Sequence, residues 1–173
     1  MKTANIKKGL AVLLMLFGIM NTYAQISKAE IIATGLTCSM CSNAINKQLK
    51  TLPEVEKVLI DLNSNTFMVY LKKDSAITPK ALKANVEKAG FFIGSMVLTM
   101  EVDKSQKNNS GFKNESGTYI VVDSNDNPVE ESIRLKVLNS GYVTKKEYKQ
   151  STKMLSKYLV SGTKEETYFV KII

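Results

Sequence analysis

The stretch Gly35-Leu36-Thr37-Cys38-Ser39-Met40-Cys41 contains the only two cysteines of the 173-residue chain and marks a change in secondary structure. Residues 29–34, immediately before it, are rich in β-branched side chains and predict a strand that Gly35 ends. After it, apolar side chains recur at helical spacing as far as residue 52. The stretch therefore predicts a strand-to-helix junction with both thiols at the start of the helix.

The placement of these thiols predicts a site for a soft metal ion. The unpaired N–H groups and the dipole at a helix N-terminus favour a thiolate over a thiol. A thiolate pair prefers Cu(I), with Zn(II) and Hg(II) as alternatives. We therefore expect Cys38 and Cys41 to close on one ion, most readily Cu(I).

The absence of histidine narrows the chemistry further. The chain lacks the imidazole needed for a Cys/His zinc site, for histidine general-base catalysis or for a Ser/His/Asp arrangement. A structural zinc ion normally takes four protein ligands, and two thiolates do not supply them. We expect a metal-binding protein and not an enzyme.

A hairpin is predicted after the first helix. Pro53 ends the helix, and apolar side chains then alternate over residues 56–62 and 66–71. Asn63-Ser64-Asn65 between them is a turn signal. A second helix should follow, with Thr78 as N-cap, Pro79 as its first residue and Gly90 just beyond its end, before a last strand over 93–102.

Residues 27–101 resemble a heavy-metal-associated domain, the βαββαβ module of copper chaperones and of copper-ATPase amino-terminal repeats. The family signature GMTCxxC appears as the stretch from Gly35 to Cys41, with Leu36 in place of the usual methionine. A second marker, an Ala-Gly-aromatic step, appears as Ala89-Gly90-Phe91. The resemblance implies an α+β, ferredoxin-like fold in which two helices cover one face of a four-stranded antiparallel sheet.

The resemblance also implies roles for individual residues. Cys38 and Cys41 would be the metal ligands, Gly35 and Thr37 would shape the loop, and Phe91 would cover it as part of its immediate surroundings. Met40 would be an exposed spacer and not a third ligand.

Residues 1–24 have the features of a signal peptide. Three lysines precede an apolar run of 11 residues, Leu10 to Met20, which is shorter than the roughly 20 residues that span a bilayer. Ala24 is a small residue suited to cleavage before Gln25. We expect a periplasmic or secreted protein without stable membrane insertion; an uncleaved amino-terminal anchor is the alternative.

The net charge argues against a nucleic-acid partner. The formal charge is +8, and removing residues 1–24, with their three lysines and no acids, lowers it to +5. The remaining lysines are dispersed and lack interleaved aromatic side chains, so most are interpreted as a solvated surface. Attraction to an acidic protein surface stays open.

Two cysteines in an exported chain raise a redox alternative, because oxidising compartments form disulfides. A structural disulfide across so short a loop would add little stability. A thiol-disulfide exchange protein would also place such a pair at a helix start, but the strand pattern here differs from the thioredoxin pattern and no tryptophan precedes the motif.

The rest of the chain divides into two parts. Residues 25–102 are assigned to the heavy-metal-associated domain, and residues 103–117 have the composition of a linker. Residues 118–173 predict a small β-rich unit with one helix, which a capping box opens at Thr144 and Gly162 ends. This unit contains no cysteine, so we expect it to serve partner docking or stability and not a second metal site.

The leading hypothesis is an exported chaperone for metal homeostasis that carries Cu(I) and transfers it to a partner by ligand exchange. The partner would be a metal-donating or metal-accepting protein, such as a copper-transporting ATPase or an efflux component. A periplasmic mercury scavenger, a thiol-disulfide exchange protein and a structural adaptor are the alternatives.

Overall fold

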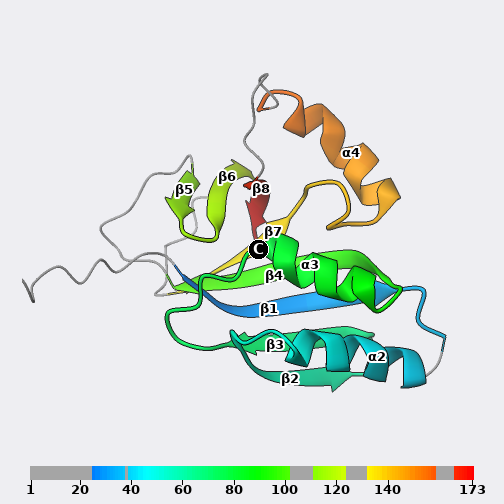
Figure 1. The fold of residues 1–173 in the computed structure, drawn as a ribbon. Helices are drawn as coiled ribbons and strands as arrows, with labels where there is room; N and C mark the ends of the chain where they lie inside the picture. Colours follow the sequence, from blue (N-terminus) through cyan, green and yellow to red (C-terminus); the bar gives the residue numbers. More distant parts are fainter. Residues whose placement is uncertain (1–24, 38, 102–110, 124–131, 159–165) are drawn as a thin grey trace, which may run out of the picture.

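The computed structural model describes residues 25–37, 39–101, 111–123, 132–158 and 166–173. They contain one eight-stranded sheet with the strand order β2-β3-β1-β4-β7-β8-β6-β5 (Figure 1). The predictions for residues 1–24, for Cys38 and for residues 103–110 of the linker lie outside the described residues. In the part of the chain that is described, no helix is long and apolar enough to cross a membrane.

The first half of the sheet has the predicted ferredoxin-like arrangement. Its strands and helices, in chain order, are β1 (Gln25–Thr34), α2 (Ser39–Lys50), β2 (Val55–Asp61), β3 (Thr66–Leu71), α3 (Pro79–Lys88) and β4 (Phe92–Glu101). β1 pairs antiparallel with β3 and β4, and β2 pairs antiparallel with β3. Both helices lie on the same face of the sheet (Figure 1), so the predicted α+β fold class is confirmed.

Local signals set the ends of α3 as the sequence predicts. Thr78 is the N-cap, and its hydroxyl accepts a hydrogen bond of 3.1 Å from the N–H of Ala81. Pro79 begins the helix, where its missing N–H leaves no helical hydrogen bond unmade. Gly90 follows the helix with φ +88, a conformation that favours glycine.

The second half of the chain is the expected small β-rich unit with one helix. It consists of β5 (Gly111–Asn114), β6 (Gly117–Asp123), β7 (Ser132–Val137), α4 (Lys145–Leu155) and β8 (Thr167–Ile172). β8 pairs parallel with β6 and antiparallel with β7, and β7 pairs antiparallel with β4. The second half therefore extends the sheet of the first half.

The prediction of a linker over residues 103–117 is wrong for residues 111–117, the part of it that the structure describes. Residues 111–114 form β5, and Gly117 begins β6. A Cβ atom on Gly111 would lie only 2.3 Å from the backbone oxygen of Tyr119, so the close strand pairing requires glycine here. The glycines and polar side chains that resemble a linker serve instead to form a tight hairpin.

The predicted helix of the second half begins correctly but ends early. Thr144 is its N-cap and accepts a hydrogen bond from the N–H of Glu147, which is one of the two hydrogen bonds of a capping box. The carboxylate of Glu147 forms an ion pair with Lys136. α4 then ends at Leu155 and not near Gly162, because the chain turns at once: the N–H of Tyr158 donates to the carbonyl oxygen of Leu155 at 2.9 Å.

One hydrophobic cluster joins the two halves beneath α2 and α3. Leu98 of β4 and Leu135 of β7 are register partners, and both are completely buried in it. The rings of Phe112, Tyr119 and Tyr168 stack with centroid separations of 5.2 and 5.3 Å. Burial raises the pKa of Tyr119 far above its usual value, so the phenol stays neutral within the cluster.

A second, smaller cluster lies on the opposite face of the sheet, under α4. Its buried members are Val122, Leu138, Val143, Leu155 and Phe169. In β8, Tyr168 and Val170 belong to the first cluster and Phe169 to the second. Because side chains alternate between the two faces of a strand, α4 covers the face opposite α2 and α3.

Candidate metal centre

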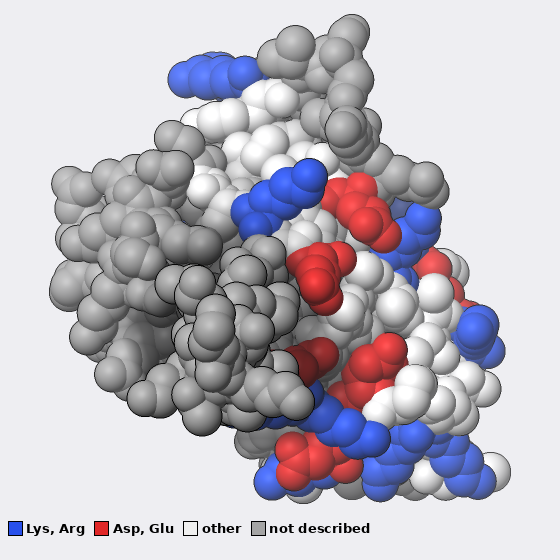
Figure 2. Space-filling model, turned by 60° about the vertical axis from the view of Figure 1, so that its left-hand side comes forward, with Lys and Arg blue, Asp and Glu red and all other residues white. Residues whose placement is uncertain are grey.

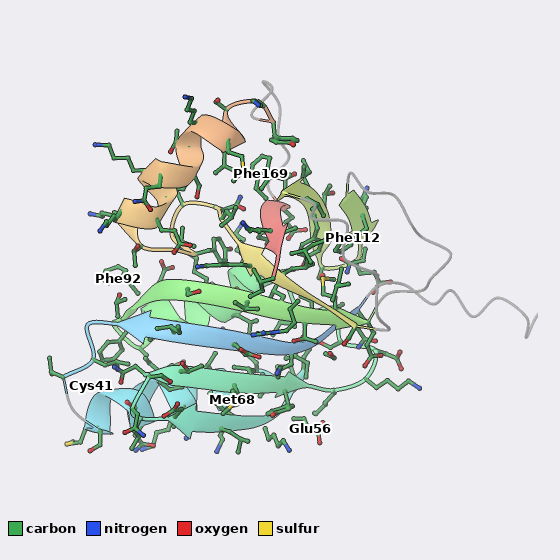
Figure 3. The ribbon with its side chains drawn as sticks, turned by 180° about the vertical axis from the view of Figure 1, so that it is seen from behind. Cys41, Glu56, Met68, Phe92, Phe112 and Phe169 are labelled. Carbon is green, nitrogen blue, oxygen red and sulfur yellow. The ribbon has the colours of Figure 1, made fainter. Side chains whose placement is uncertain are left out.

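Cys41 lies in the first turn of α2, where it is half-buried. No acidic side chain stands in that turn, so the positive end of the helix dipole is not offset there. Figure 3 shows Cys41 where the chain passes from β1 into α2. Cys38 is outside the described residues, and its role as the second ligand stays a prediction.

Gly35 turns the chain out of β1 toward this helix. Its φ is +87, which favours glycine over residues with a side chain. Cδ1 of Phe91 lies 3.9 Å from the place where a Cβ on Gly35 would stand. The structure thus brings the predicted residues Gly35 and Phe91 together at the base of the loop.

The loop is anchored on one side and exposed on the other. Leu36 and Phe91 are partly buried and pack against the main hydrophobic cluster. The N–H of Phe91 also donates to the carbonyl oxygen of Val86 in α3 at 3.3 Å. Thr37 is exposed and Met40 is 80% exposed, which agrees with the exposed position that the family resemblance implies for Met40.

The described residues offer no richer set of ligands elsewhere. They contain no group of three or more His, Cys, Asp or Glu side chains that could hold a metal ion. Met96 and Met100 of β4 are completely buried in the core, as expected for packing residues. Cys41 is the only cysteine within the described part of the chain.

One exposed aromatic side chain near the loop was not predicted from the sequence. Phe92 is 68% exposed and is the register partner of Thr34, the last residue of β1 before Gly35. Figure 3 shows Phe92 and Cys41 at the same end of the molecule. Since Phe92 directly precedes the predicted strand 93–102, strand alternation would have placed it opposite the buried Ile93.

Comparisons with known proteins connect this arrangement to one family. Residues 30–92 match the model of the heavy-metal-associated domain. Among solved structures, the yeast copper transporter domain Ccc2a is 35% identical, with 38% of this chain and 88% of that chain covered and a TM-score of 0.35. The N-terminal domain of a potential copper-translocating P-type ATPase from Bacillus subtilis is 31% identical, with 39% and 82% covered and a TM-score of 0.34.

A putative copper-ion-binding protein from Bacillus anthracis is 28% identical, with 40% of this chain and 96% of that chain covered and a TM-score of 0.36. No sequence among the curated proteins matches this chain. The family match covers the loop, Cys41 and Phe91, and it runs from within β1 to the first residue of β4. Residues 30–92 are therefore a heavy-metal-associated domain.

Proposed function

We propose that this protein is an exported metallochaperone that binds Cu(I) between Cys38 and Cys41 and passes it to a partner protein. The observation that carries the proposal is the half-buried thiol of Cys41 in the first turn of α2, within a heavy-metal-associated domain. The metal ion is cargo, so the protein needs no catalytic group. The features of residues 1–24 described above support export.

Two thiolates leave Cu(I) with room for a third ligand, and this allows transfer without release of a free ion. A partner thiol loses its proton and forms a Cu–S bond, the bond to Cys41 or Cys38 then breaks, and the released thiolate takes up a proton. The same exchange with a second partner thiol breaks the remaining bond and completes the transfer. Copper stays Cu(I) throughout. The exposure of Thr37 and Met40 leaves the loop accessible, and the apolar contacts of Leu36 and Phe91 hold its base in place. A copper-transporting ATPase or an efflux component is the class of partner proposed.

Metal titration tests this function directly. The reduced protein lacking residues 1–24 is expected to take up one equivalent of Cu(I) in competition with a Cu(I) chelator, and to bind Zn(II) much more weakly, because two thiolates suit a soft ion of low coordination number. Competition with Hg(II) measures the mercury alternative. Submicromolar Zn(II) affinity without comparable Cu(I) affinity would refute the copper assignment.

Phe91 provides a second test, with its neighbour Phe92 as the control. Phe91→Ala is expected to weaken Cu(I) binding about tenfold, the scale of effect for residues that support metal ligands, because Phe91 packs at the base of the loop. Phe92→Ala removes the same side chain from an exposed position and should leave Cu(I) affinity unchanged. Equal affinities for the two variants, both verified as folded by circular dichroism, would mean that Phe91 does not support the loop.

A further inference from the structure

The exposed side of α4 carries a row of lysines. We call it the lysine face: Lys145, Lys146, Lys149 and Lys153 of α4, and Lys157 in the turn after it. All five side chains are exposed, and no ion pair among the described residues involves them. The acid of α4, Glu147, pairs with Lys136 of β7. The positive charge of the lysine face is therefore not neutralised by the described part of the protein.

The other side of α4 is already occupied by the protein itself. Leu155 is 1% exposed, and Tyr148 and Met154 are partly buried against the second cluster. A helix that lies in a membrane surface inserts its apolar side between the lipids, and α4 has no such side to offer. Since only its charged side faces outward, an acidic protein surface is a better match than a lipid bilayer.

The lysine face begins at the same end of the molecule as the metal loop, by which we mean Gly35, Leu36 and Thr37 after β1 and Cys41 at the start of α2. Cγ2 of Thr144, the N-cap of α4, lies 3.9 Å from the place where a Cβ on Gly94 would stand, and Cγ2 of Thr34 lies 2.6 Å from that place. Thr34 is followed directly by Gly35 and the loop. The exposed ring of Phe92, the register partner of Thr34, belongs to the same end. Figure 3 shows α4, Phe92 and Cys41 along one side of the molecule.

Charge is arranged differently on another face. Figure 2, which brings forward the left-hand side of Figure 1, shows basic and acidic side chains interspersed over the described residues. In Figure 1, α4 and the passage from β1 to α2 are both on the right-hand side. On the face that Figure 2 shows, positive side chains stand beside negative ones, whereas no ion pair among the described residues involves the lysine face.

We propose that the lysine face and Phe92 form the docking surface for an acidic segment of the protein that exchanges metal with Cys41. This proposal rests on the proposed transfer function and specifies the chemistry of its partner. The lysines raise the rate of encounter with an acidic surface, and Phe92 supplies the apolar anchor that interfaces commonly use. Docking there brings the partner's thiolates to the exposed side of the loop.

Two synthetic acceptor peptides test the proposal. Each contains Cys-Xaa-Xaa-Cys and one leucine, preceded by a run of glutamates in one peptide and of glutamines in the other. At low salt, Cu(I) should pass from the protein to the glutamate peptide about ten times faster than to the glutamine peptide, the lower end of the range for electrostatic steering. The advantage should disappear at about 1 M salt, where charges are screened within roughly 3 Å.

Matched variants locate the surface. In the triple variant Lys145→Gln, Lys149→Gln, Lys153→Gln, Cu(I) should pass to the glutamate peptide hardly faster than to the glutamine peptide. The triple variant Lys72→Gln, Lys73→Gln, Lys113→Gln removes the same charge from exposed positions outside the lysine face. In this variant, transfer to the glutamate peptide should stay about ten times faster than transfer to the glutamine peptide. Equal losses in both variants would show a general charge effect and overturn the proposal.

A metal-free measurement separates docking from metal transfer. The same peptides with serine in place of cysteine, labelled for fluorescence anisotropy, should bind in a glutamate- and lysine-dependent manner, and Phe92→Ala should weaken that binding several-fold. If the peptide binds while the protein takes up no Cu(I), the docking surface stands and the proposed function fails. If Cu(I) passes equally fast to both peptides, or if phosphatidylglycerol vesicles bind the lysine face and the glutamate peptide does not, the docking proposal is wrong.

Discussion

Cu(I) affinity is expected to fall more than about a hundredfold when Cys41 is replaced by serine. Loss of a residue that only supports a ligand typically costs about 10–100-fold in metal affinity, so loss of one of two thiolate ligands should exceed that range. A serine hydroxyl is a harder donor and stays protonated at neutral pH, which makes it a poor ligand for Cu(I). Competition with a Cu(I) chelator under reducing conditions measures the change.

Met40→Leu is the matched control for this experiment. Met40 is one residue away in the same helical turn and is 80% exposed, so its replacement should leave Cu(I) affinity within about twofold, since no ligand is lost. Unchanged affinity in Cys41→Ser would contradict the proposed metal centre. Accumulation of a mixed disulfide through Cys38 in that variant, together with catalysis of thiol exchange by the unaltered protein, would favour the redox alternative.

The first half of the fold could be predicted because its signals are local. Thr78, Pro79 and Gly90 fix the ends of α3 through their own backbone conformations and hydrogen bonds. Alternation over β3 marks Phe67, Val69 and Leu71 as buried, and they are. Each of these signals acts within a few residues, so no knowledge of the partner strands was needed.

The joining of the two halves could not be predicted in the same way. Leu98 and Leu135 each follow a strand pattern, but nothing within either strand shows that β4 and β7 are neighbours. The hydrogen bond from the N–H of Lys80 to the hydroxyl of Tyr168, at 3.3 Å, joins residues 88 positions apart. No local sequence pattern predicts it either. A polar stretch between two patterned regions therefore suggested a linker, whereas its described residues, 111–117, belong to the hairpin of β5 and β6.

Part of the candidate site could likewise be predicted from the sequence, and part could not. The position of Cys41 in a first helical turn followed from periodicity, and the closeness of Phe91 to Gly35 followed from the family resemblance. The spacing of Lys145, Lys149 and Lys153 was visible, but such lysines usually form a solvated face. Only the packing of α4 against the sheet shows that these charges begin beside the metal loop.

A shared core predicts that the metal-binding half and the second half unfold together. Leu135→Ala should lower the free energy of unfolding by about 2–5 kcal/mol, the range for a leucine truncated in a packed core, because Leu135 is completely buried in the main cluster. Leu62→Ala is the control: this side chain is 58% exposed, and its loss should change the free energy of unfolding by less than about 0.5 kcal/mol.

Tyrosine fluorescence can follow this coupling across the sheet. Among the described residues, Tyr70 belongs to the metal-binding half and the other tyrosines belong to the second half, so the signal reports mainly on the second half. Free Cu(I) at about 100 times its Kd stabilises the state that binds it by about 2.7 kcal/mol. In a protein of this size, that gain should raise the Tm reported by tyrosine by about 5–10 °C. The opposite outcome is that Cu(I) raises the Tm reported by a probe attached to α2 and leaves the Tm reported by tyrosine unchanged. In that case the two halves unfold independently and the shared core does not couple them.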